Sequence, residues 1–97
     1  MKELNLQKIQ IKLRNKFLNS GVKMTGPETI FFSNDTKIGK NVKIANNVVI
    51  KSFSHLESCK IENKVEVGPY ARIRPDTLLK EGSKIGNFVE IKKSTVG

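Results

Sequence analysis

Residues 67–97, VGPYARIRPDTLLKEGSKIGNFVEIKKSTVG, place an aliphatic residue at every sixth position. The members of this row are Val67, Ile73, Leu79, Ile85 and Ile91. An amphipathic helix repeats its apolar positions at three-to-four spacing, and a half-buried strand repeats them at every second residue. A period of six fits neither, so the pattern predicts a repeat unit in which a short strand and a turn alternate.

The same period continues upstream. The complete aliphatic row is Ile38, Ile44, Ile50, Leu56, Ile61, Val67, Ile73, Leu79, Ile85 and Ile91, with a single step of five between Leu56 and Ile61. A second row of small or β-branched residues follows four positions later, at Val42, Val48, Ser54, Val65, Ala71, Thr77, Ser83, Val89 and Thr95. Lys60 interrupts this second row at the step of five, and the neighbouring Cys59 is its expected substitute.

Two inner positions per six residues, one bulky and one small, suit a flat strand followed by a sharp corner. Three such sides close a coil of about eighteen residues, and stacked coils pair each strand with the next at about 4.8 Å. The predicted fold is mainly β, a left-handed parallel β-helix over residues 38–97 with an N-terminal α-helix. The left hand is inferred from resemblance to hexapeptide-repeat proteins and not from the period.

Two further segments precede the repeats. Residues 1–21 predict a connector-like amphipathic helix, centred on residues 4–18 and stopped by Asn19-Ser20-Gly21. Its apolar positions form two rows, Leu6, Ile9, Leu13 and Phe17 in one and Leu4, Ile11 and Leu18 in the other. Residues 22–37 predict an irregular lead-in segment with a Gly26-Pro27 turn and one short strand.

Composition excludes several classes of protein. A chain of 97 residues fits one small domain, and none of its apolar runs has the eighteen or more residues of a membrane span. The first residues also lack the apolar core of a signal peptide, so we expect a cytoplasmic protein. With one histidine, His55, and one cysteine, Cys59, we expect no disulfide and no metal site. A small buried residue is the favoured interpretation of Cys59.

The formal net charge is +9, and residues 1–23 hold six of the basic side chains against the single acid Glu3. A basic helix could contact an anionic surface such as nucleic acid. Basic and aromatic residues do not alternate in it as they do in surfaces that stack bases, so a solvated helix face is the favoured interpretation. Nucleic acid is therefore the least favoured partner.

Four stretches outside the repeat positions resemble a known family: SGVKMTGPETIFFSNDTKIG (residues 20–39), FSHLES (53–58), VGPYARIRP (67–75) and GNFVEIKKS (86–94). They are similar to the start of the acetyltransferase domain of the bifunctional bacterial enzyme that makes UDP-N-acetylglucosamine. That enzyme joins an N-acetylglucosamine-1-phosphate uridyltransferase to a glucosamine-1-phosphate N-acetyltransferase. The resemblance runs from about residue 5 to residue 97, and RIRP with GNFVEIKK is its most specific part.

The resemblance implies that Arg74 and Lys92 bind the sugar phosphate, with UDP-N-acetylglucosamine or glucosamine phosphate as the expected ligand. These residues follow Ile73 and Ile91 and lie eighteen positions apart, so the period places them on the same face of neighbouring coils. An arginine fork beside a lysine point charge suits a phosphate. The competing interpretation is that both are ordinary solvated side chains, as expected for Lys51 and Lys80.

The family uses acetyl-CoA and magnesium, but we expect this chain to lack the residues that use them. The uridyltransferase half has no counterpart before residue 5, and the coils that carry the general base and the acetyl-CoA site would follow residue 97. His55 lies in a different motif from that base and is expected to be structural. We therefore predict no catalytic residue and no cofactor site here.

Two functions compete for this sequence. The first is a truncated homologue of the acetyltransferase domain that is not catalytic alone and retains part of a sugar-phosphate site. The alternative is a structural or regulatory module that trimerises with itself or joins a full-length homologue. The resemblance implies a homotrimer.

Overall fold

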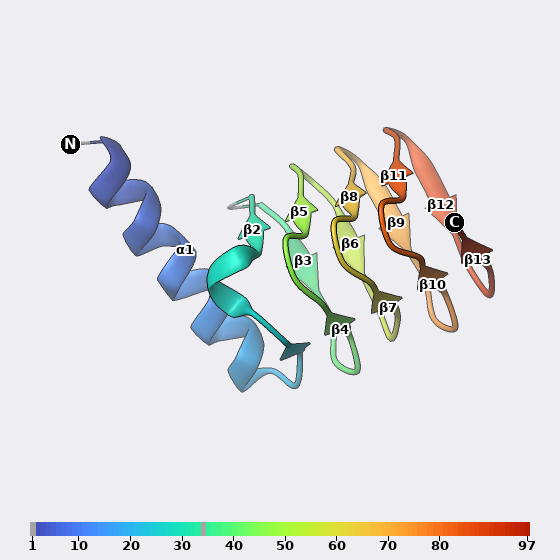
Figure 1. Cartoon of the computed structure of the whole chain (residues 1–97), viewed down its shortest axis with the longest axis horizontal. Helices are drawn as coiled ribbons and strands as arrows, with labels where there is room; N and C mark the ends of the chain where they lie inside the picture. Colours follow the sequence, from blue (N-terminus) through green and yellow to red (C-terminus); the bar gives the residue numbers. More distant parts are fainter. Residues whose placement is uncertain (1, 34) are drawn as a thin grey trace.

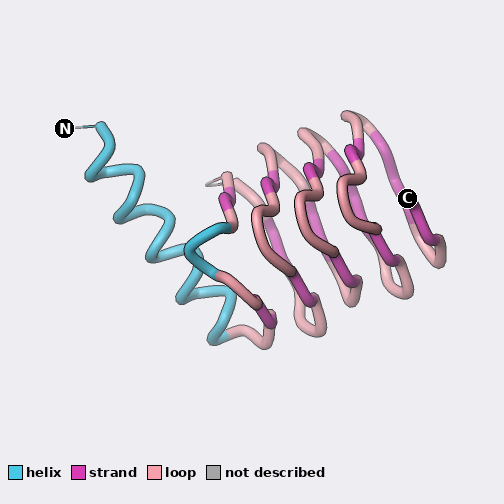
Figure 2. The backbone as a smooth tube through the Cα atoms, viewed as in Figure 1, coloured by secondary structure: helices cyan, strands magenta, loops and turns pink. Residues whose placement is uncertain are grey.

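The computed structural model describes residues 2–33 and 35–97, with side chains from residue 7 onward. Within these residues one helix leads into a column of stacked coils, each built from short strands and turns (Figures 1 and 2). The helical elements are α1 (Lys2–Asn19) and the 3₁₀ turn η1 (Pro27–Thr29). The strands are β1 (Lys23–Met24), β2 (Phe31–Phe32), β3 (Lys37–Ile38), β4 (Lys43–Ile44), β5 (Val49–Ile50), β6 (His55–Leu56), β7 (Lys60–Ile61), β8 (Glu66–Val67), β9 (Ala71–Ile73), β10 (Leu78–Leu79), β11 (Lys84–Ile85), β12 (Val89–Ile91) and β13 (Thr95–Val96).

These strands form three parallel sheets, one for each side of a triangular prism. The strand orders are β1-β4-β7-β10-β13 in the first sheet, β2-β5-β8-β11 in the second and β3-β6-β9-β12 in the third. Each strand pairs with strands one coil away, as when Phe31 pairs with Val49, eighteen residues further on. The arrangement and the hexapeptide repeats fit a left-handed parallel β-helix, so the predicted fold class is confirmed.

The two predicted rows line the inside of the prism. The bulky row is buried from Ile44 to Ile85, with exposed fractions of 5% or less, whereas Ile38 and Ile91 are only partly buried. The small row is buried at Val42, Val48, Ser54, Cys59, Val65, Ala71, Thr77 and Ser83. Cys59 is 4% exposed and Lys60 is exposed, which confirms that Cys59 substitutes at the step of five.

The step of five occurs at one corner of the prism, between the third sheet and the first. Leu56 in β6 is followed by Ile61 in β7, so Lys43 pairs with Lys60 only seventeen residues on. A second step of five, from Ile91 to Val96, occurs at the same corner two coils later. Thr95 consequently pairs with Leu78 as a strand residue and does not take the small inner position that the period predicts.

The corners turn through residues in the left-handed conformation, and most of them are not glycine. These residues are Asn41, Asn47, Phe53, Ser58, Lys64, Tyr70, Asp76, Phe88 and Lys93, with φ between 40° and 64°. Three of them stack in a column along the edge between the second and third sheets. The ring of Tyr70 lies 5.1 Å from that of Phe53 and 4.9 Å from that of Phe88, with interplanar angles of 15° and 5°. All three rings are exposed, so this edge carries an aromatic column.

Helix α1 lies against the first coil and covers one end of the core (Figure 1). Leu13 and Phe17 are buried, and the ring of Phe17 meets that of Phe32 edge-on at 4.8 Å. Ile9 of the same predicted row is 37% exposed, and Ile11 and Leu18 of the other row are exposed as well. The predicted positions Leu4 and Leu6 lie outside the described side chains. Among the described side chains, Leu13 and Phe17 bring the helix into the core, while Ile9, Ile11 and Leu18 lie outside it.

Polar side chains on α1 complete the hydrogen bonds of the first coil. The Gln10 side chain is buried, donates to the carbonyl of Phe32 (2.7 Å) and accepts from the N–H of Phe32 (2.9 Å). Arg14 donates to the carbonyl of Ile30 through Nε (3.2 Å) and Nη2 (2.9 Å). A side chain thus takes the place of a neighbouring strand at the edge of the second sheet, where β2 would otherwise expose its backbone.

The segment before the repeats already belongs to the sheets. Within residues 22–37, β1 pairs with β4 and β2 pairs with β5. Lys23 pairs with Lys43, twenty residues on, because η1 lengthens this first coil. The period therefore begins at Ile38 while the coiled structure begins earlier. None of the described helices is long and apolar enough to cross a membrane.

Two glycines with positive φ should respond differently to substitution. Gly68 has φ of 87° and is buried, and a Cβ there would meet the Ser54 hydroxyl, whereas Gly82 has φ of 79° and open space around it. Both alanine variants carry backbone strain, and only Gly68→Ala adds a collision inside the core. We expect Gly68→Ala to lose at least about 1 kcal/mol more unfolding free energy than Gly82→Ala. Urea unfolding of both variants measures this difference, and equal losses would contradict it.

Candidate functional site

Arg74 lies at the corner that leads from the third sheet to the first. It follows β9, and its backbone N–H donates to the carbonyl of Ile91 in the next coil at 2.7 Å. The side chain is partly buried. Its Nε is buried and has no hydrogen-bond partner among the described residues. Buried polar groups in proteins normally have a hydrogen-bond partner. The N–H at Nε of Arg74 is therefore a donor whose partner is missing from the described residues.

Lys92 lies directly beyond Arg74 along the prism. Ile73 pairs with Ile91, so the residues that follow them come from neighbouring coils at the same corner. The Lys92 side chain is exposed. The one-coil separation expected from the spacing of eighteen is thus observed in the backbone register. Two cations in this arrangement repel one another and favour an anion between them.

The coil on the other side of Arg74 carries a carboxylate that the sequence analysis did not place. Leu56 pairs with Ile73, so the residues that follow them, Glu57 and Arg74, occupy equivalent positions in neighbouring coils. Glu57 Oε1 lies 3.2 Å from Nε2 of His55. His55 is partly buried and sits on β6, facing outward in register with Arg72. The sequence could have indicated this neighbour, because Glu57 and Arg74 are seventeen residues apart, which is the length of a coil that contains the step of five.

His55 therefore has a carboxylate neighbour on its own strand segment. The two groups form an ion pair when the imidazole is protonated, and no ion pair between Glu57 and Arg74 occurs among the described side chains. No described carboxylate lies within ion-pair distance of Arg74. Among the side chains that the structure describes, Arg74 and Lys92 at this corner have no ion-pair partner.

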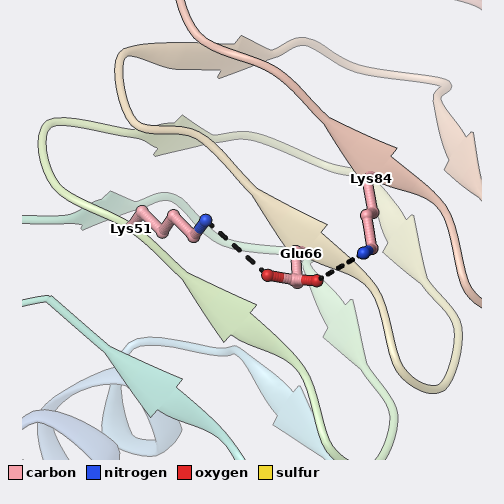
Figure 3. A network of polar contacts seen from close by, with 3 residues as sticks. All are labelled: Lys51, Glu66 and Lys84. Atoms are coloured by element: carbon pink, nitrogen blue, oxygen red, sulfur yellow. Dashed lines mark ion pairs between the residues drawn. The ribbon is translucent and has the colours of Figure 1, made fainter.

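A different arrangement occurs on the second sheet, where charges neutralise one another. Glu66 on β8 lies 3.6 Å from Lys51 and 3.7 Å from Lys84, which come from the coils on either side (Figure 3). Lys51 is solvated, as the sequence predicts, and has an ion-pair partner as well. The carboxylate between the two ammonium groups offsets their repulsion, and each pair is worth little in free energy because the three side chains are 38–79% exposed.

Cys59 is unsuited to chemistry. Burial raises the pKa of its thiol to about 12. At pH 8 we expect the native thiol to react with a disulfide reagent at least about 100-fold more slowly than the unfolded thiol, whose pKa is near 8.5. Absorbance of the released thiolate, followed with and without urea, measures the two rates. Comparable rates would show that the first sheet opens at this corner.

The described residues contain no group of three His, Cys, Asp or Glu side chains that could hold a metal ion. What the corner can do chemically is bind an anion through Arg74 and Lys92.

The stacked parallel strands and the period of six define a hexapeptide-repeat β-helix. Residues 58–93 match the family model described as bacterial transferase hexapeptide, six repeats. The match begins within the first step of five and ends within the second. The residues between these two steps form the longest stretch with an unbroken period of six.

The chain is also similar in sequence to the bifunctional protein GlmU of several bacteria. The chain is 46% identical over 99 residues to the GlmU of Zymomonas mobilis, which covers 90% of this chain and 22% of the relative. It is 47% identical over 96 residues to that of Wolbachia pipientis wMel, with 87% and 22% covered. For Anaplasma marginale strain Florida the identity is 42% over 100 residues, with 91% and 23% covered. The predicted resemblance is confirmed, and the chain spans about a fifth of the length of these relatives.

Proposed function

We propose that this chain forms part of a GlmU-type acetyltransferase domain and holds one half of a sugar-phosphate site at Arg74 and Lys92. The observation that carries the proposal is the partly buried Arg74 guanidinium, whose Nε lacks a partner among the described residues beside a second cation one coil away. The similarity to GlmU over most of the chain supplies the ligand class, a phosphate of glucosamine or UDP-N-acetylglucosamine.

The proposed role of these residues is binding and charge stabilisation. The planar guanidinium of Arg74 can donate to two oxygens of one phosphate, and the Lys92 ammonium adds a positive charge from the neighbouring coil. Acetyl transfer also needs a base for the amine and a placed thioester, and we assign neither to this chain. The proposed activity of the residues described is therefore recognition without catalysis.

A test of this proposal is a titration with UDP-N-acetylglucosamine followed by amide chemical shifts. We expect saturable shifts clustered at residues 72–75 and 90–93, and about tenfold or greater weakening in Arg74→Ala, since a hydrogen bond to a charged group contributes about 1.5–3 kcal/mol. Arg72→Ala is the matched control, because Arg72 is exposed on the same strand two residues away. Equal weakening by both variants, or no shifts at millimolar ligand, would overturn the proposal.

We also propose that the chain assembles in the cytoplasm as a homotrimer or together with a longer homologue. The supporting observation is the exposed aromatic column of Phe53, Tyr70 and Phe88, because exposed aromatic groups of this size mark protein contacts. Native mass spectrometry of the wild type and of Phe88→Ser tests this. A trimer that persists unchanged in the variant would exclude the column from the contact, and a wild-type monomer would remove the assembly proposal.

A further inference from the structure

The first sheet carries a row of lysines on its outer face, separate from the Arg74 and Lys92 pair. Lys23 pairs with Lys43, and Lys43 pairs with Lys60, so the three side chains leave adjacent strands at the same register. All three are exposed. With strands about 4.8 Å apart, the row spans roughly 10 Å along the prism. We call Lys23, Lys43 and Lys60 the lysine row.

The lysine row lacks the neutralising partner that the second sheet provides. There, Glu66 stands between Lys51 and Lys84 and contacts both. Among the described side chains, no carboxylate lies within ion-pair distance of a member of the lysine row. Like charges directly opposite one another on paired strands destabilise a sheet, so the row retains an uncompensated repulsion.

The surface around the row is a shallow trough. Its volume is about 310 Å³, and the lysine row lines it together with Met24, Thr25, Ile44, Ala45 and Ile61. The size is that of a site for a small ligand and not for a folded protein. The row ends at β10, where Leu78 occupies the position in register with Lys60.

We propose that the lysine row binds an oligophosphate, a short linear run of phosphate groups. Three ammonium groups in single file match a linear anion of similar length, and each can approach a different phosphate as a point charge. The trough offers no aromatic ring to stack a base and no arginine fork, so recognition rests on the phosphates alone. The ligand can be inorganic or the phosphate tail of a nucleotide.

The test uses the whole chain with inorganic tripolyphosphate as the probe, in calorimetry and in amide-shift titration. We expect saturable binding with shifts on β1, β4 and β7. Lys43→Gln removes the central charge of the row and is expected to weaken binding about tenfold, as for the loss of one charged hydrogen bond. Raising the salt concentration should weaken binding as well, because exposed charges are screened beyond about 8–10 Å.

Lys84→Gln is the matched control, since it removes the same charge from the second sheet, where Glu66 is the partner. It should leave the affinity for tripolyphosphate unchanged. Equal weakening by Lys84→Gln and Lys43→Gln would show attraction to the net charge of +9 alone and would overturn the inference. Shifts confined to other parts of the chain would do the same.

Two more ligands define what the row recognises. Orthophosphate should bind at least about tenfold more weakly than tripolyphosphate, because it can reach only one or two of the lysines at once. Equal affinity would contradict recognition of a linear run. ATP that binds as tripolyphosphate does would support recognition of the phosphate tail, and tighter binding of ATP through the same lysines would identify the nucleotide as the source. Arg74→Ala should not affect any of these titrations, so this inference and the sugar-phosphate proposal can fail separately.

Discussion

Ile61→Ala is expected to lower the free energy of unfolding by about 3–4 kcal/mol, within the range for removing a buried isoleucine side chain. Ile61 is 1% exposed and lies between Ile44 and Leu79, its register partners in the coils on either side. The cavity would open in the middle of the column, where neighbouring strands are held in place by their own hydrogen bonds. Urea unfolding followed by circular dichroism measures the loss.

The matched control is Ile11→Ala on helix α1, where the isoleucine is 54% exposed. This change removes little buried area and adds helix propensity, so we expect it to alter the unfolding free energy by less than about 1 kcal/mol. Similar losses in the two variants would mean that the aliphatic column is not the main source of stability.

Gln10→Ala is the second large effect, with an expected loss of about 2–4 kcal/mol from two buried backbone groups that lose their partners. The Gln10 side-chain amide hydrogen-bonds both the N–H and the carbonyl of Phe32, on the strand at the edge of the second sheet. Without it, α1 would still pack through Leu13 and Phe17, but over an unsatisfied strand edge.

Gln7→Ala separates this hydrogen-bond effect from a change in the helix, because Gln7 is exposed on the same helix. Its variant should keep the wild-type stability within about 0.5 kcal/mol. Hydrogen exchange at the Phe32 amide provides a local readout, since only Gln10→Ala should accelerate it. Unchanged exchange would show that water or another group replaces the glutamine.

Much of the fold could be predicted from the sequence because the inside of the prism repeats chemically. A bulky residue such as Ile73 and a small one such as Ala71 recur on each side, and both are buried as expected. Cys59 could be placed in the small row as well. The step from Leu56 to Ile61 is one residue short, so the small inner position falls on Cys59 and not on Lys60. The period of six therefore predicts which two residues each side of a coil buries.

The features that the period missed lie where one coil differs from the next. The second step of five follows Ile91, where only one further aliphatic residue, Val96, could reveal it. Strands β1 and β2 precede the row of sixes because η1 lengthens their coil. The sequence gives no sign that the Gln10 side chain makes both backbone hydrogen bonds of Phe32, as a neighbouring strand would. A single polar residue in a helix has many possible roles.

The candidate site shows the same division. Arg74 and Lys92 lie eighteen residues apart and could be placed on one face directly, although their binding role remains a proposal. The members of the lysine row are separated by twenty and seventeen residues, so no fixed period brings them together. Their alignment appears only when the unequal lengths of the coils are known.

The aromatic column has a practical consequence for spectroscopy. Tyr70 is the single tyrosine of a chain without tryptophan, so the longest-wavelength ultraviolet emission of the protein arises from this ring. Phe53 and Phe88 sandwich that ring from the coils on either side. The intrinsic fluorescence therefore reports on the spacing of three successive coils, and unfolding, assembly through this edge or separation of the coils can each be followed without an attached dye.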